Sequence, residues 1–343
     1  MGNCLPKTKR RPRSSKTIAE SSPAAVQLIG LGTCPITCRI RVALLYKGVI
    51  VDLVETGAYA GAPFLRCGSE KVAGSEESLL RYIDKRFGGP QAAAPTVSEQ
   101  WEGRNTAAEV VTMQHRSIRR HVEGMARWAS KIEEESGGVG GVNVSAAEGR
   151  RLGKWYGDLV EIMLEHAQME ERLLFPAFAR TADDGKPPVA NQQHGRDLPI
   201  INGIKEDLKS MMAMNADGPL YKEAALNLSL RFKVLQEHCK QHFDEEERVL
   251  LPLLVDSERV RREEREEPWP PSRWVEQVAA LTEATHSRLF AFFATGLLPF
   301  EALQYVRLVA GGDERRAVTM LRSLAGAIET SPWHSWLREI GLH

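Results

Sequence analysis

The sequence predicts a mainly α-helical protein, in which an up-down four-helix bundle follows a small α/β domain and precedes a helical extension. Two observations predict the bundle. The phrase His-x-x-x-Glu-Glu-Arg-x-Leu-x-Pro occurs at residues 166–176 and again at 242–252. A helical segment with an inward-facing His precedes each copy, so the two halves form a repeat. A third observation separates the domains, because residues 26–88 contain short apolar strands.

Length and composition limit the class of protein. With 343 residues and 43 % apolar composition, the chain can support two or three domains. Its formal net charge of zero gives no global attraction to nucleic acid, and its five Cys show no regular framework, which favours a reducing compartment. No apolar run is long enough to span a membrane. A basic tail, the α/β domain, the bundle and the extension are predicted at residues 1–25, 26–90, 105–256 and 270–343.

The tail begins Met1-Gly2-Asn3-Cys4, which resembles a dually acylated N-terminus with myristate on Gly2 and palmitate on Cys4. Six basic residues follow before the first acidic residue, Glu20. Two acyl chains and a basic cluster would favour stable binding to an anionic cytoplasmic leaflet. Pro6 departs from the myristoylation pattern, and a disordered basic tail or part of a transit peptide are the alternatives.

The α/β domain is predicted as a β-α-β unit followed by a hairpin and a closing helix, at residues 26–30, 36–47, 49–54, 63–65 with 71–73, and 75–87. This order, with residues 33–39 and 79–84, resembles the thioredoxin-like N-terminal domain of glutathione transferases. The resemblance implies that Pro63 is the cis-proline of a binding edge and that Ser75 could contact glutathione. The helix between the second and third strands is shortened.

Cys34 opens the motif Cys34-Pro35-Ile36-Thr37, which takes the place of the glutaredoxin-type Cys-Pro motif. A Cys at a helix N-terminus has its thiolate stabilised by free backbone N–H groups and the helix dipole. Three interpretations stay open: a degenerate docking module, which is favoured, a thiol or glutathione-dependent enzyme, and a disulfide between Cys34 and Cys38.

The bundle helices are predicted at roughly 100–135, 146–179, 191–214 and 219–256, separated by Gly-, Pro- and Asp-containing loops. His and Glu four residues apart share a helix face. That face is otherwise apolar, with residues such as Leu159, Leu235, Val249 and Leu253. Buried imidazole–carboxylate pairs are costly unless something satisfies them, and a metal ion would. Imidazoles mixed with carboxylates suit iron or manganese.

Residues 105–256 resemble a hemerythrin-like (HHE cation-binding) domain through the repeated motif. The resemblance implies a di-iron site in which two glutamates, Glu170 and Glu246, bridge the metals. The implied ligands are His115, His166, Glu170, His194, His242 and Glu246. Leu198 stands where oxygen-carrying hemerythrins have a second His, and His238 is an additional candidate ligand. Glu171 and Glu247 are expected to form solvated ion pairs with neighbouring Arg, with contact to a metal as the alternative for either. His121 is expected to be a bystander.

The leading functional hypothesis is a di-iron protein for iron or oxygen sensing, or iron handling, and the sequence leaves enzymatic activity open while leaning against it. It would lie at the cytoplasmic face of the plasma membrane, or otherwise in the cytoplasm. The extension at 270–343 shows no motif, and it is expected to pack on the bundle or on an unidentified protein partner. The competing hypothesis is a thiol enzyme acting through Cys34, and a scaffold with a vestigial metal site is the third.

Overall fold

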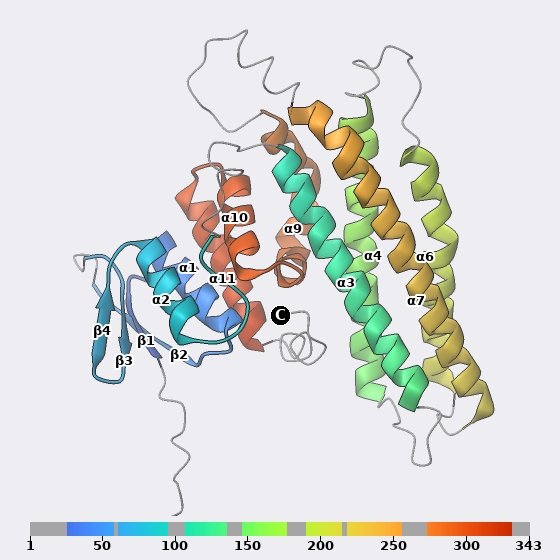
Figure 1. The fold of residues 1–343 in the computed structure, drawn as a ribbon, viewed down its shortest axis with the longest axis horizontal. Helices are drawn as coiled ribbons and strands as arrows, with labels where there is room; N and C mark the ends of the chain where they lie inside the picture. Colours follow the sequence, from blue (N-terminus) through green and yellow to red (C-terminus); the bar gives the residue numbers. More distant parts are fainter. Residues whose placement is uncertain are drawn as a thin grey trace, which may run out of the picture.

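The structure is a computed structural model that describes residues 26–57, 61–94, 107–135, 146–176, 190–214, 218–255 and 273–330. Its parts lie in a row. The four-stranded sheet lies at one end and the long helices of the bundle at the other, with the C-terminal helices between them (Figure 1). The predicted fold class, mainly helical with a small N-terminal α/β domain, is confirmed. The basic tail, with Gly2 and Cys4, lies outside the described residues.

The α/β domain has the predicted element order. It contains β1 (Val26–Gly30), α1 (Pro35–Tyr46), β2 (Val51–Glu55), β3 (Phe64–Cys67), β4 (Glu70–Ala73) and α2 (Glu76–Arg86). The sheet order is β2-β1-β3-β4, with β1 parallel to β2 and antiparallel to β3. The apolar β1 is central because it alone is buried along most of its length. This topology fits the predicted thioredoxin-like domain. Only residues 56–63 connect β2 to β3, which is too short for an ordinary crossover helix.

Four long helices form the bundle, as predicted. They are α3 (Ala107–Glu135), α4 (Ala146–Met169), α6 (Ala190–Ala213) and α7 (Pro219–Glu245). The π-helical turns η2 (Glu170–Leu174) and η3 (Glu246–Leu250) continue α4 and α7 through the two copies of the repeated phrase. The first and second predicted loops, and the predicted helical residues 177–179, lie outside the described residues.

The π-helical turns move the apolar stripe along each helix. Val249 and Leu253 were expected inside with the metal ligands, but they are 40 % and 43 % exposed. Leu251 and Leu254 are buried instead. A π-turn holds one more residue than an α-turn, so every side chain after it is rotated away from the ordinary 3.6-residue register. The expectation that Val249 and Leu253 face the interior is therefore wrong, because the π-helical turn η3 changes the helix register locally.

The C-terminal helices join the two ends of the molecule. They are α9 (Arg273–Thr295), α10 (Pro299–Ala310) and α11 (Glu314–Thr330). Helix α9 packs on α4 and α3, and α11 packs on α1. The Tyr46 hydroxyl of α1 donates to the carbonyl of Ala294 at 2.7 Å, and Arg41 pairs with Glu329. The helical extension was expected to pack on the bundle or on a protein partner. It packs on the bundle and also covers the α/β domain. Among the described residues, no helix has the length and apolarity to cross a membrane.

Candidate metal centre

Six inward side chains meet in the middle of the bundle. Helix α3 contributes His115, α4 and η2 contribute His166 and Glu170, α6 contributes His194, and α7 and η3 contribute His242 and Glu246. They form two groups of four, and both glutamates belong to both groups. The first group adds His115 and His166, and the second adds His194 and His242. Within each group one ligand atom per residue lies within 4.8 Å of the others, which is the arrangement of two metal positions with shared carboxylates.

Glu170 lies among three imidazoles. Its Oε1 is 3.0 Å from Nε2 of His166 and 3.5 Å from Nε2 of His115. Its Oε2 is 3.3 Å from Nε2 of His194. Burial alone raises the pKa of this carboxyl group, but the surrounding histidines hold it well below its ordinary value. The surrounding imidazoles therefore favour the ionised form of Glu170, which is the form that binds a cation.

Glu246 faces the other side of the same interior. Its Oε2 lies 3.4 Å from Nε2 of His115, and its Oε1 lies 3.5 Å from Nε2 of His242. Burial and the nearby Glu170 carboxylate raise the pKa of Glu246 well above its ordinary value. Two carboxylates at close range in a buried space repel each other, and a cation between them would remove that repulsion.

Unsatisfied polar atoms are concentrated at this centre. Oε2 of Glu170, both carboxylate oxygens of Glu246 and Nε2 of His166 are buried without a hydrogen bond of good geometry. Burying such atoms costs free energy unless they are paired. Burial also lowers the pKa of His166, and that of His242 to about 3, so these rings are neutral with a lone pair available for coordination. The donor set thus fits metal cations.

The second glutamate of each repeated phrase holds a histidine of the opposite hairpin. Glu247 accepts from Nδ1 of His115 at 3.0 Å and also pairs with Arg119 of α3 at 3.2 Å. Glu171 accepts from Nδ1 of His194 at 2.9 Å. The expected arginine partner is present for Glu247, whereas the partner of Glu171, whose side chain is 45 % exposed, is a histidine. The histidine contacts themselves were not expected. The π-helical turns begin at Glu170 and Glu246, and they place the glutamate that follows each of these residues beside a histidine.

His238 lies outside both groups. Its Nδ1 pairs with Asp197 at 3.1 Å and its side chain is 37 % exposed, so the structure does not support it as an extra ligand. Leu198 is 45 % exposed on α6 and does not face the centre. His121 is also outside the groups. It accepts a hydrogen bond from Trp155 Nε1 at 3.3 Å and stacks on Phe292, with ring centroids 4.2 Å apart.

The α/β domain departs from the resemblance at three positions. The peptide bond before Pro63 is trans, and the chain enters β3 at the next residue, so the expected cis-proline is wrong. Ser75 caps α2 by accepting from the backbone N–H of Ser78 at 3.2 Å, and nothing in the structure supports a contact with glutathione. Cys34 and Cys38 are free thiols, because Cys38 Sγ is turned to the carbonyl of Gly32 at 3.3 Å. The disulfide expectation is therefore wrong.

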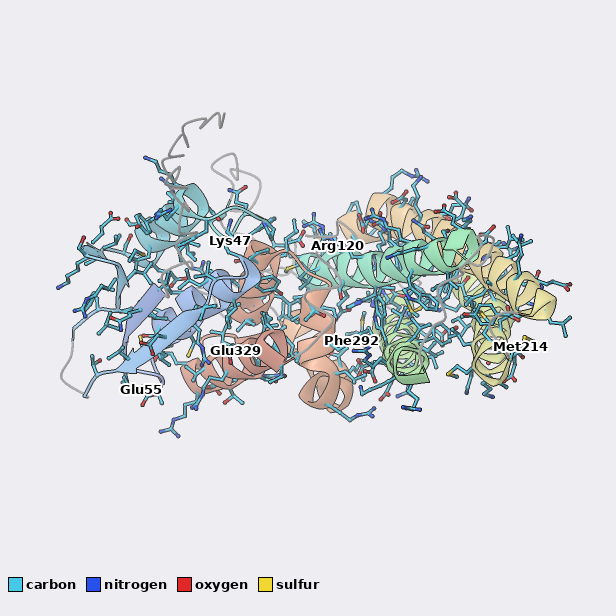
Figure 2. The ribbon with its side chains drawn as sticks, turned by 90° about the horizontal axis from the view of Figure 1, so that it is seen from below. Lys47, Glu55, Arg120, Met214, Phe292 and Glu329 are labelled. Atoms are coloured by element: carbon cyan, nitrogen blue, oxygen red, sulfur yellow. The ribbon has the colours of Figure 1, made fainter. Side chains whose placement is uncertain are left out.

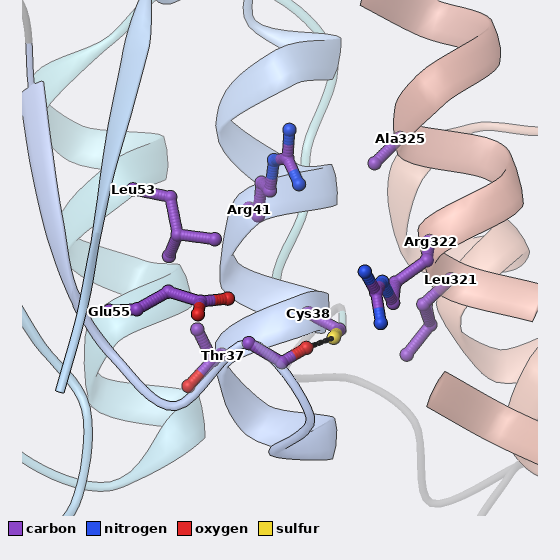
Figure 3. Close-up of a pocket in the computed structure, with 9 residues that line it drawn as sticks. Thr37, Cys38, Arg41, Leu53, Glu55, Leu321, Arg322 and Ala325 are labelled. Carbon is purple, nitrogen blue, oxygen red and sulfur yellow. Dashed lines mark hydrogen bonds between the residues drawn. The ribbon is translucent and has the colours of Figure 1, made fainter. Parts of the chain in front are cut away.

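A cavity of about 70 Å³ lies between α1, β2 and α11 (Figure 3). Its lining is mixed in polarity and consists of Gly32, Thr37, Cys38, Arg41, Leu53, Glu55, Leu321, Arg322 and Ala325. Cys34, the N-cap residue of α1, is not one of the lining residues. Burial raises the pKa of the Cys38 thiol, which leaves it a poor nucleophile. The cavity thus adds no support to a thiol enzyme.

The fold and the centre define a metal-binding four-helix bundle with shared carboxylates. Residues 106–254 match the family model of the hemerythrin HHE cation binding domain. The resemblance carried by the repeated phrase is thereby confirmed. No curated protein and no solved structure matches the chain.

Proposed function

We propose that the bundle binds two iron ions, and that the protein senses iron or oxygen or handles iron. The observation that carries the proposal is the pair of overlapping ligand groups, which share two buried carboxylates with unsatisfied oxygens. Four imidazoles and two carboxylates are hard and borderline donors, which suit iron better than a thiolate site would. Bundle interiors lined by such residues on facing helices are a known location for metal pairs.

The protein's own residues prepare the centre. His115, His166, Glu170 and Glu246 would hold one ion, and His194 and His242 with the same glutamates the other. Bound iron would supply reversible one-electron chemistry that responds to dioxygen. His115 stacks on Phe243 with ring centroids 4.3 Å apart, so an apolar ring covers the ligand and excludes water.

Metal content of the full chain tests the proposal. After anaerobic loading with Fe(II) and removal of excess metal, we expect about two irons per chain, as the two ligand groups imply. Glu170→Ala combined with Glu246→Ala should abolish retention, because both positions lose their shared ligands. Glu223→Ala, at an exposed position of the same helix α7, is the matched control and should retain the wild-type content. Wild-type protein that retains no iron, or a double variant that retains as much, would contradict the proposal.

We also propose that the N-terminus attaches the protein to the cytoplasmic face of a membrane. Gly2, Cys4 and the basic cluster that follows them support this. Incorporation of a myristate analogue and a membrane-bound fraction are expected for the wild type, and both should be lost in Gly2→Ala. Cys4→Ser should keep the myristate but weaken attachment, because one acyl chain binds only marginally. A wild-type chain that takes up no acyl group would contradict the proposal.

A further inference from the structure

A buried hydrogen-bond chain leaves the centre and ends on a helix outside the hemerythrin domain. Nδ1 of His166 lies 3.0 Å from the side-chain oxygen of Gln114. The side-chain nitrogen of Gln114 donates to the hydroxyl of Tyr305 on α10 at 3.3 Å. His166, Gln114 and Tyr305 are 4 %, 3 % and 1 % exposed. The three side chains come from α4, α3 and α10, so the hydrogen bonds link the bundle to the C-terminal helices.

The direction of these bonds selects the tautomer of His166. An amide oxygen only accepts, so this orientation of Gln114 places a hydrogen on Nδ1, and the neutral ring then has its lone pair on Nε2. That Nε2 lies 3.0 Å from Glu170, at the centre. If the amide of Gln114 were reversed, its NH₂ would face Nδ1 and the hydrogen would move to Nε2, where it would block coordination.

His166 differs from His115 and His194 in the group that accepts a hydrogen bond from its Nδ1. His115 and His194 donate to the carboxylates of Glu247 and Glu171, which have no reversed orientation. His166 depends on a neutral amide, and the amide's NH₂ group is bound by Tyr305. The Tyr305 ring is itself packed against Phe293, with centroids 4.7 Å apart, so its hydroxyl has a fixed place.

We propose that Tyr305 is a positioning residue of the metal centre, which fixes the Gln114 amide and through it the coordinating tautomer of His166. The inference rests on the proposed metal binding, and it extends the working site beyond residues 106–254. In this proposal Tyr305 acts on the centre through Gln114.

The first test measures release of iron from the full chain. Wild type and Tyr305→Phe are loaded anaerobically with Fe(II), and the release rate to an excess of ferrous chelator is followed by absorbance. We expect faster release from Tyr305→Phe, near the lower end of the roughly 10- to 100-fold effects of outer-shell changes. A changed visible spectrum of the Co(II)-loaded variant should accompany it, because a rotated or partly protonated imidazole alters the ligand field.

Tyr46→Phe is the matched control, since it removes another buried hydroxyl hydrogen bond at the junction with the C-terminal helices. It should release iron at the wild-type rate. Gln114→Glu provides the rescue test, because a carboxylate accepts from Nδ1 in either orientation. Adding Tyr305→Phe to Gln114→Glu should then leave the release rate of Gln114→Glu unchanged. Equal rates for wild type and Tyr305→Phe, or equal acceleration by both Tyr variants, would overturn the inference.

The tautomer can also be read without metal, which separates this inference from the proposed function. In full-length metal-free protein labelled with ¹⁵N-histidine, His166 should show the Nδ1–H tautomer in the wild type. Tyr305→Phe should show a mixture of both tautomers. If the wild type binds no iron but this difference is seen, the metal proposal fails while the positioning role stands. The same tautomer in both proteins overturns the positioning role, whatever the iron content.

Discussion

At the residue scale, the repeated phrase makes contacts that its spacing does not predict. The four-residue spacing predicts that His166 and Glu170 share a face, and likewise His242 and Glu246, and the structure brings all four together. The adjacent Glu171 and Glu247 could not be assigned from spacing, because their histidines belong to the opposite hairpin. Gln114 was also missed. Its position beside His115 in the sequence was the available signal.

Glu247 gives a direct test of these outer contacts. Replacing Glu247 with Ala removes the acceptor for Nδ1 of His115 and frees the ring to rotate. We expect iron affinity to fall by roughly 10- to 100-fold, measured by chelator competition. Glu223→Ala, at an exposed position of α7, should have no effect. Equal affinity in the two variants would show that Glu247 does not orient the ligand.

The thiols differ in reactivity at the same scale. Burial and the nearby Asp197 raise the pKa of the Cys239 thiol, and burial raises that of Cys38. The thiolate is the reactive form, so we expect iodoacetamide at pH 8 to leave both unmodified in the native protein. Cys34 is partly exposed and should be alkylated. Peptide mass spectrometry before and after denaturation measures this, and rapid native labelling of Cys239 would contradict the structure.

At the element scale, the helices were predictable and their register past the centre was not. Apolar spacing predicts the four bundle helices, because amphipathic periodicity is strong over long segments. The π-helical turns η2 and η3 interrupt this periodicity one turn after His166 and His242. The sequence contains no pattern that predicts such turns. For this reason Val249 and Leu253 were assigned to the interior and are exposed. The tight coupling of these turns to the ligands agrees with the frequent occurrence of π-bulges at functional sites.

Helix α10 begins with a buried carboxylate that also contacts the bundle. Glu301 accepts from the backbone N–H of Leu298 at 2.8 Å, and pairs with Arg116 and Arg120 of α3. Figure 2 shows Arg120 at this junction between α3 and the C-terminal helices. Breaking a buried ion pair costs about 3–5 kcal/mol. Because the arginines are partly exposed and solvent screens their charges, we expect Glu301→Gln to lower the free energy of unfolding by an amount at or below the low end of that range.

The pH dependence of this effect has a definite sign. Burial raises the pKa of Glu301, but Arg120 and the other partners lower it overall. A carboxyl group with a depressed folded pKa stabilises above its unfolded value of about 4.3 and loses that contribution as pH falls below it. The stability gap between wild type and Glu301→Gln in urea should therefore be large at pH 7 and shrink in acid. Exposed Glu314→Gln, which loses only a favourable charge in the first turn of α11, should show a much smaller gap at pH 7.

At the scale of the whole molecule, the domain order along the chain differs from the order in space. The helical extension was expected to pack on the bundle or on a partner, but it lies between the bundle and the α/β domain. Sequence reasoning could not show this, because helices without motifs give no sign of which surface they cover. The hydroxyl of Ser117 on α3 donates to the carbonyl of Phe293 at 2.7 Å, so α9 supplies a hydrogen-bond acceptor for a buried polar group of the bundle.

A bundle fragment should therefore be weaker than the full chain. Residues 100–260 lack α9 to α11, and the fragment exposes the face of α3 and α4 that these helices cover. We expect a lower urea midpoint and faster release of iron to a chelator than in the full chain. Circular dichroism and absorbance measure the two effects. A fragment as stable and as retentive as the full chain would show that the bundle is self-sufficient.

The two ligand groups are unequal in their contact with water. The group with His115 and His166 is buried throughout, whereas the side chain of His194 in the other group is 12 % exposed. An ion would enter and leave on the His194 side, so the two positions should empty one after the other. Release to a chelator would then be biphasic, and a half-loaded chain would accumulate between the phases. If the protein senses iron as proposed, the outer ion would respond to a mild shortage of metal and the inner ion to a severe one.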